Sequence, residues 1–333
     1  MGPAGATERH GLREEAKAAM GLTIGVDIGG TKIAAGVVDE QGKILSRVRR
    51  DTPAQDGKQT VQAIAACINE LVADHEEIIG AGLGAPGFID AARSTVLFTP
   101  NLPWRNEPLR AEVEQLTGLP VVVENDANAA AWGESVFGAG SAQPYTITLT
   151  VGTGLGGGIV INGALVRGAF GVAAEVGHIN IVPDGLRCGC GLLGCWEQYA
   201  SGSALVREAR ELAARSPENA GRLLKLGDGT PEKITGPQVT RAAREGDPIA
   251  IEALYAIGHW LGHGMADLAA TLDPRLFIIG GGVSEAGALI AVPARESFKA
   301  RLTARGHRPE AEVRLAQLGQ DAGLIGAADL ARR

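Results

Sequence analysis

Two glycine-rich loops, each directly after an apolar strand-like run, constrain the fold of this chain most strongly. The first is Asp27–Lys32, which spells Asp-Ile-Gly-Gly-Thr-Lys and follows Leu22–Val26. The second is Gly152–Gly158, which carries Thr153 and follows Tyr145–Val151. A glycine backbone can turn sharply and bring its N–H groups up to a phosphate. One such loop more often marks a tight turn, but the repetition favours a pair of phosphate-binding loops.

Each loop also supplies polar groups that suit a nucleotide. The threonine hydroxyls are hydrogen-bond donors, Asp27 provides a carboxylate for a metal ion, and Lys32 provides a positive charge for phosphate. The sequence therefore predicts a site for nucleotide phosphates and a metal ion that uses Asp27, Gly29, Gly30, Thr31, Lys32, Gly152, Thr153 and Gly154.

Composition argues against several classes of function. With 333 residues the chain is longer than a single hydrophobic core usually serves, so we expect two domains. The formal net charge is −7, and no basic stretch suits a nucleic acid or an anionic membrane surface. No apolar run approaches the ~20 residues of a membrane span. The N-terminus lacks the apolar segment of a signal peptide, so we expect a cytoplasmic protein.

The apolar patterns predict a mixed α/β fold that starts twice. A hairpin followed by strand–helix alternation begins at Leu22, and a second strand–loop–strand unit begins at Tyr145, which resembles a duplicated domain. We expect a flexible N-terminal extension over residues 1–20. The predicted small α/β domain covers 21–129 and is completed by a C-terminal helix over 319–333. The predicted large α/β domain covers 130–318 and carries the metal site.

Periodicity places the individual elements. The long helix predicted over Ile249–Leu272 contains Gly258, Gly262 and Gly264, which we expect to admit another helix at close range. The predicted strands are Leu22–Val26, Ile33–Asp39, Lys43–Val48, Ile78–Leu83, Pro120–Val123, Tyr145–Val151, Gly158–Asn162, Leu276–Ile279 and Val313–Leu318. The other predicted helices are Thr60–Ala73, Leu109–Leu116, Ala127–Val136, Cys195–Ala214, Thr240–Arg244 and Asp321–Leu330.

Asp126 lies where a predicted strand ends and a helix begins. Aspartate and asparagine are favoured at this point as helix caps, which contribute about 1 kcal/mol. Strand ends of α/β sheets are also where ligands bind. Asn125 and Asp126 together offer donors and acceptors in a small volume, which suits a polyhydroxylated ligand. Both interpretations can hold at once.

Three cysteines and one histidine have the spacing of a metal site. Cys188, Cys190 and Cys195 lie within eight residues, and His178 precedes them. Three thiolates and one imidazole complete a tetrahedral set, which is typical of a structural zinc ion rather than a catalytic one. The alternatives are buried free thiols or a redox pair.

Other polar side chains suit a sugar. Asn101 lies in a proline-stiffened loop beside Trp104, and sugars are often bound by an amide together with an aromatic face. Glu175 and Glu197 flank the cysteine–histidine segment. A metal that holds this segment rigid would position both carboxylates to accept hydrogen bonds from a ligand.

Together these segments resemble the ROK family of sugar kinases and repressors, in the actin-like ATPase superfamily. The resemblance covers residue 22 to the end, and its most specific parts are Asp27–Lys32, Glu175–His178 and Cys188–Glu197. It implies an α/β fold of two actin-like (ribonuclease H-like) ATPase domains with a cleft between them. The sugar is expected deep in the cleft, and ATP is expected across the two glycine loops, with its adenosine near Gly280–Ser284.

The resemblance also implies a role for each motif residue. Asp126 is similar to the family's catalytic base, and the implied reaction transfers phosphate from MgATP to the 6-hydroxyl of glucose. The nucleotide-binding set then extends to Gly280, Gly281 and Gly282. The implied sugar-contacting residues are Asn101, Asn125, Asp126, Glu175, His178 and Glu197, and one structural Zn²⁺ is expected on His178, Cys188, Cys190 and Cys195. A homodimer or homotetramer is the family expectation.

Other functions stay open at this stage. A kinase for N-acetylglucosamine, N-acetylmannosamine or fructose would share these motifs, which do not determine the shape of the sugar pocket or whether polyphosphate can replace ATP. A sugar-sensing repressor is disfavoured, because the 26 residues before Asp27 lack two apolar-periodic helices and the acidic charge disfavours DNA. An actin-like chaperone or cytoskeletal ATPase would have no need for the cysteine–histidine cluster.

Overall fold

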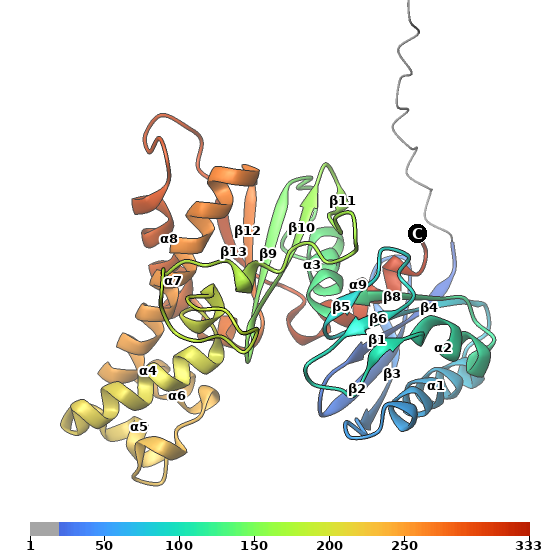
Figure 1. Ribbon diagram of the computed structural model, residues 1–333, viewed down its shortest axis with the longest axis horizontal. Helices are drawn as coiled ribbons and strands as arrows, with labels where there is room; N and C mark the ends of the chain where they lie inside the picture. The colour runs from blue at the N-terminus through green and yellow to red at the C-terminus, as the bar shows by residue number, and fades with distance from the viewer. Residues whose placement is uncertain (1–19) are drawn as a thin grey trace, which may run out of the picture.

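The computed structural model describes residues 20–333, which contain two five-stranded mixed sheets (Figure 1). The first sheet consists of β1 (Leu22–Ile28), β2 (Lys32–Val38), β3 (Ile44–Asp51), β4 (Ile78–Ala85) and β8 (Val121–Asn125). The second consists of β9 (Thr146–Val151), β10 (Leu155–Ile161), β11 (Ala164–Leu165), β12 (Leu276–Gly280) and β13 (Glu312–Leu315).

The two sheets have the same topology. Their strand orders are β3-β2-β1-β4-β8 and β11-β10-β9-β12-β13. In each sheet the first three strands in the chain pair antiparallel, and the later two join parallel to the first. The predicted α/β fold with a second start near Tyr145 is therefore confirmed.

Helices cover the outer face of each sheet and bury its apolar residues. Two helices pack on the first sheet, and Ile64 and Ile68 of the longer one lie fully in that core. Five helices belong to the second core, whose buried cluster includes Leu261, Met265 and Phe277. The helices are α1 (Gly57–Asp74) and α2 (Leu109–Thr117) on the first sheet, and α4 (Gly202–Arg215), α5 (Gly221–Leu226), α6 (Gly236–Arg244), α7 (Pro248–Leu272) and α8 (Ala288–Arg301) around the second.

Two further helices cross from one sheet to the other. Helix α3 (Asp126–Phe137) follows β8 of the first sheet but packs against β9 and β10 of the second, and α9 (Ala322–Leu330) follows β13 of the second sheet but packs against β1 and β4 of the first (Figure 1). The two helices also pack on each other at glycines: a Cβ on Gly326 would lie 1.8 Å from the Ala129 carbonyl oxygen. The crossing places the ends of both sheets around one region.

Two of the three glycines of α7 admit a neighbouring helix, as predicted, whereas Gly264 faces the side chain of Trp196. A Cβ on Gly262 would lie 2.3 Å from the carbonyl oxygen of Ala294 on α8, and one on Gly258 would meet Pro293 at 2.5 Å. Helix α8 itself was not predicted, because Pro293 lies inside it and interrupts the sequence signal for a helix.

The start of one predicted helix needs correction, and one small sheet was not predicted. The helix predicted over Cys195–Ala214 begins at Gly202, because Ser201 caps it by accepting a hydrogen bond from the Ala204 N–H. A small sheet of β5 (Phe88–Ile89), β6 (Val96–Phe98) and β7 (Arg105–Glu107) was not predicted, since its strands are too short for a periodic signal.

The predicted N-terminal extension lies outside the described residues, except for Met20. Among residues 20–333, none of the helices combines the length and apolarity that crossing a membrane requires.

The contact between α9 and the first sheet leads to a stability prediction. A Cβ on Gly82 of β4 would lie 1.8 Å from the Ala327 carbonyl oxygen of α9, and backbone cannot move aside as a flexible side chain can. Gly82→Ala is expected to lower the free energy of unfolding by about 1–3 kcal/mol, the usual effect of overpacking. Urea unfolding monitored by circular dichroism measures it.

Gly221→Ala is the matched control, because a Cβ at this first residue of α5 meets no atom within 4 Å. Its stability should equal or slightly exceed that of the wild type. If Gly82→Ala is as stable as Gly221→Ala, α9 does not lie directly on β4.

Candidate active site

A cavity of about 550 Å³ opens where the carboxyl ends of four strands converge. Asp27 lies near the end of β1, Asp126 directly follows β8, Gly152 follows β9, and Gly280 ends β12, and all four line this cavity. Ligands of α/β sheets bind at the carboxyl ends of strands. We refer to this space as the central cavity.

A second cavity of about 630 Å³ adjoins it and contains all the polar residues predicted to contact a sugar. Asp126 and Glu197 line both spaces, so these two carboxylates lie at the junction. We refer to the second space as the polar cavity. The predicted residues that line it are Asn101, Asn125, Asp126, Glu175, His178 and Glu197.

Asp126 is the first residue of α3, and its half-buried carboxylate accepts a hydrogen bond from the Ala127 N–H at 2.8 Å. The pKa of Asp126 is raised to about 6. Desolvation by the surrounding protein is the main cause; the Ala127 hydrogen bond opposes the shift, and the neighbouring charges of Asp27 and Glu175 add to it. A carboxyl with such a pKa can accept a proton near neutral pH.

The helix cap that the sequence suggested is Asn125 rather than Asp126. The Asn125 side-chain oxygen accepts from the Asn128 N–H at 3.0 Å, and its amide nitrogen donates to the Gly87 carbonyl at 3.0 Å. These bonds fix the junction between β8 and α3 and leave Asp126 free to face the cavities. One N–H of the Asn125 amide still has no protein partner among the described residues.

The aromatic neighbour proposed for Asn101 needs correction. Trp104 is fully buried in the first core, where its indole N–H donates to the Gly57 carbonyl, so it does not face a ligand. The rings that line the polar cavity are instead Phe88 and Phe98, whose centroids lie 6.1 Å apart. No pattern in the sequence pointed to them, because they belong to the very short strands β5 and β6.

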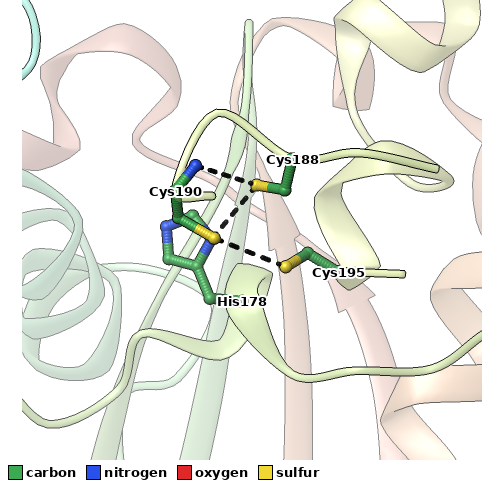
Figure 2. Close-up of side chains that lie close together, drawn as sticks. All are labelled: His178, Cys188, Cys190 and Cys195. Atoms are coloured by element: carbon green, nitrogen blue, oxygen red, sulfur yellow. Dashed lines mark hydrogen bonds between the residues drawn. The ribbon is translucent and has the colours of Figure 1, made fainter. Parts of the chain in front are cut away.

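The predicted cysteine–histidine cluster is brought together by the fold (Figure 2). Ligand atoms of His178, Cys188, Cys190 and Cys195 all lie within 4.8 Å of one another, with 3.6 Å between the sulfurs of Cys190 and Cys195. Bonds of about 2.3 Å from zinc to sulfur would separate tetrahedral ligands by about 3.8 Å. The donor set and its spacing therefore fit one tetrahedral zinc ion.

The cluster and the polar cavity share residues. Nδ1 of His178 lies 3.7 Å from the Cys188 sulfur, whereas its Nε2 lies 3.9 Å from the Glu175 carboxylate. Desolvation raises the pKa of Glu175, His178 opposes that shift, and the charge of Glu197 adds to it. The two ring nitrogens of His178 thus face the thiols and the cavity separately.

The two glycine loops contribute unequally to the central cavity. Gly152, Thr153 and Gly154 line it, as does Asp27 of the first loop. Gly29, Gly30 and Thr31 do not line this cavity, and Lys32 lines a separate one of about 600 Å³ that it shares with Asp27.

Two backbone N–H groups that were expected to bind phosphate instead form hydrogen bonds within the glycine loops. The Gly29 N–H donates to the Lys32 carbonyl and the Gly152 N–H donates to the Gly154 carbonyl. Both donors close tight turns, so they are not free for a phosphate.

A fourth cavity, of about 1020 Å³, lies beside the central cavity between α4 and α6. We refer to it as the α4–α6 cavity. Thr153 lines both the central cavity and the α4–α6 cavity, whereas Gly282 lines only the α4–α6 cavity. Gln320 lines these two cavities and the one that contains Lys32. The sequence had not singled out Gln320 or the residues of α4 and α6, because nothing in their local pattern says that these helices meet the glycine loops. Examples are Ser203, Val206, Thr240 and Arg241.

The chain is similar to known proteins in sequence and in fold. The chain is 57% identical to the glucokinase of Streptomyces coelicolor, over 94% of this chain and 98% of that protein. It is 33% identical to the xylose repressor of Caldicellulosiruptor bescii, over 85% of this chain and 71% of the repressor. The crystal structure of a ROK family glucokinase from Streptomyces griseus in complex with glucose and AMPPNP matches with a TM-score of 0.86 and 57% identity, covering 94% of this chain and 99% of that one. The ROK family model matches residues 23–333, and the chain belongs to this family.

Proposed function

We propose that this protein transfers the γ-phosphoryl group of ATP to the 6-hydroxyl of glucose. The observation that carries the proposal is the position of Asp126 at the junction of two cavities, one lined by sugar-type polar groups and the other by a glycine loop. The similarity of the chain to glucokinases over 94% of its length, and to a structure that holds glucose and AMPPNP, supports the choice of both substrates.

In this proposal glucose occupies the polar cavity with its 6-hydroxyl toward Asp126. Asp126 accepts the hydroxyl proton while the oxygen attacks the γ-phosphorus, the bond to the β,γ-bridging oxygen breaks, and ADP leaves. Little covalent work falls to the protein in such a transfer, so alignment and charge stabilisation account for most of the rate. The contacts to the other hydroxyls come from Asn101, Asn125, Glu175, His178 and Glu197.

The donor side follows from the central cavity. Asp27 is half-buried with a pKa raised by desolvation, so a cation beside it would be favoured. It would hold Mg²⁺, which neutralises charge on the phosphates when bound. Thr153 and Gly154 would contact the phosphates, with smaller parts for Gly29, Gly30, Thr31, Lys32 and Gly152. The α4–α6 cavity, next to Gly280, Gly281 and Gly282, would bind the adenosine.

The cysteine–histidine cluster would hold one structural zinc ion on His178, Cys188, Cys190 and Cys195. The ion would keep the segment between Glu175 and Glu197 in a single shape and so preorganise the sugar contacts.

We also propose the domain division from the sequence. A small domain of 21–129 with 319–333 and a large domain of 130–318 would close around the sugar and exclude water, with the crossing helices α3 and α9 between them. The homodimer or homotetramer is a prediction from the family, and the cytoplasmic location is a prediction from the sequence.

The central test is a coupled assay of ADP release with a panel of hexoses, using ATP and then polyphosphate as donor. Glucose with ATP is expected to give the highest kcat/KM, and Asp126→Asn is expected to lower kcat by about 10²–10⁴-fold because the base is lost. Calorimetry should show nearly unchanged glucose affinity for this variant. A kinase for N-acetylglucosamine, N-acetylmannosamine or fructose would prefer that sugar instead. An Asp126→Asn variant with near-normal turnover removes Asp126 from the mechanism.

The raised pKa of Asp126 predicts a pH dependence. A protonated carboxyl cannot accept the hydroxyl proton, so kcat/KM for glucose should be constant above the pKa of Asp126, about 6, and decline below it. Well below this pKa the decline should approach about tenfold per pH unit. The residual activity of Asp126→Asn should lack this decline, and circular dichroism should show that both proteins stay folded. A wild-type profile that stays flat down to about pH 5 contradicts the assignment.

The zinc proposal predicts the metal content. Elemental analysis of the purified protein should find about one zinc per chain, as expected for a single Cys₃His set. Cys190→Ala should lose the metal and lower both thermal stability and glucose affinity. Cys67→Ala serves as the control, because this cysteine is buried in α1, in the other core, and should leave the zinc content unchanged. A zinc-free protein with full activity and stability contradicts the proposal.

A further inference from the structure

Glu124 is a buried carboxylate that precedes Asn125 and the proposed base in the chain. Its residue is 2% exposed, although it lies on β8 at the edge of the site. Oε1 accepts from the Asn125 N–H at 3.2 Å and from the Asn128 side-chain amide at 3.1 Å. Oε2 accepts from Nε of Arg167 at 2.6 Å and lies 3.6 Å from Nε of Arg93.

These four neighbours come from both halves of the molecule. Asn125 and Asn128 belong to the junction of β8 and α3. Arg93 lies in the turn between β5 and β6, and its carbonyl accepts from the Val123 N–H of β8. Arg167 follows β11 of the second sheet. One carboxylate therefore joins the strand that leads to the base to a loop of the other sheet.

The loop that begins at Arg167 leads directly to the other wall of the polar cavity. Residues 167–174 end at Glu175, and the Arg167 carbonyl accepts from the Ala173 N–H within this loop. At Gly171 the loop touches the first half of the molecule, because a Cβ there would lie 2.4 Å from the Ile89 carbonyl oxygen. The loop is thus held at its start by Glu124 and at its middle by the turn after β5.

We propose that Glu124 and Arg167 form a positioning pair that sets the β8–α3 junction, with Asp126, and the loop leading to Glu175 at a fixed separation across the polar cavity. The inference rests on the proposed function, because it assigns the pair to glucose alignment. Neither residue lines the polar or the central cavity, so both act through the residues that do.

The chemistry of the four neighbours explains why this position requires a carboxylate. All four approaching groups are N–H donors, and an ionised carboxylate is an acceptor-only group. A glutamine of the same shape must turn its NH₂ toward one pair of donors, whichever way the amide is flipped. Glu124 is also the counter-charge between two arginines: the pKa of Arg93 is lowered to about 10 by burial and by Arg167, and Glu124 opposes this shift.

The test compares Glu124→Gln, Arg167→Gln and the double variant, with glucose and MgATP varied separately in the coupled assay. Each single variant should lower kcat/KM for glucose roughly 10- to 100-fold, the cost of small misplacements of reacting groups. KM for MgATP should stay close to the wild-type value, because neither Glu124 nor Arg167 lines the central cavity. The double variant should have a kcat/KM for glucose no lower than that of the less active single variant, because each single substitution already removes the same Glu124–Arg167 interaction.

Asp247→Asn is the matched control for burial alone. Asp247 is also 2% exposed and accepts from the N–H groups of Ala250 and Leu223, but it caps α7 and lines none of the four cavities described above. It should lose thermal stability while keeping its kinetic constants. Arg167→Lys, at a partly exposed side chain, retains the charge and should be folded even if the glutamine variants are not. It should show a smaller defect in the same constant, kcat/KM for glucose.

The outcomes separate the two claims. If the wild type does not phosphorylate glucose, the proposed function is wrong. If the wild type is active and the folded Glu124 or Arg167 variants differ from it only in stability, as Asp247→Asn should, the positioning pair is wrong. An equal rise in KM for MgATP, or strictly additive effects in the double variant, also overturns it.

Discussion

The backbone contact between α3 and α9 is the constraint on which the arrangement of the site depends. Each helix belongs by sequence to one sheet and packs on the other, and they meet where glycine allows helix backbone to touch helix backbone. A side chain at Gly326 or Gly133 would separate the helices, because its Cβ would overlap a carbonyl of the partner helix. The convergence of four strand ends on the central cavity follows from this packing, since neither sheet alone brings Asp27 and Gly152 together.

Much of this arrangement could be predicted from the sequence, and the successes share a physical basis. The strands whose ends meet at the central cavity are apolar and carry a glycine or a carboxylate at or directly after their ends, so these ends can be recognised in the sequence. The cluster of Cys188, Cys190 and Cys195 with His178 could be predicted because ligand chemistry requires those residue types at close range. Each of these predictions depends on local sequence with a chemical purpose.

The failures concern contacts between distant segments. Trp104 looked like a sugar-stacking ring because it follows Asn101 closely, but tertiary packing buries it, and Phe88 and Phe98 line the cavity instead. Helix α8 was missed because Pro293 obscures it, although that proline packs into the space left by Gly258. Pairing of short strands and helices through space leaves no periodic trace in a single chain.

Polar groups support the polar cavity at three places. Asn125 caps α3 and binds the Gly87 carbonyl, the cysteine–histidine cluster lies in the segment after Glu175, and Glu124 links β8 to the loop before it. A misplaced polar group is costly once it is buried, so the buried carboxylate of Glu124 specifies one geometry rather than several. The central cavity is bounded differently, since Asp27 and Gly280 come from different sheets.

The relation between the two sheets therefore sets the shape of the central cavity, whereas hydrogen bonds from both halves of the molecule set much of the polar cavity. Asp126 lies at the junction of the two cavities, so both influences act on its carboxylate. Asp126 stands at the N-terminus of α3, which favours its ionised form, yet desolvation by the converging walls prevails and raises its pKa. The raised pKa of this carboxyl thus depends on how the two sheets meet, and it could not have been inferred from Asp126 and its neighbours in sequence.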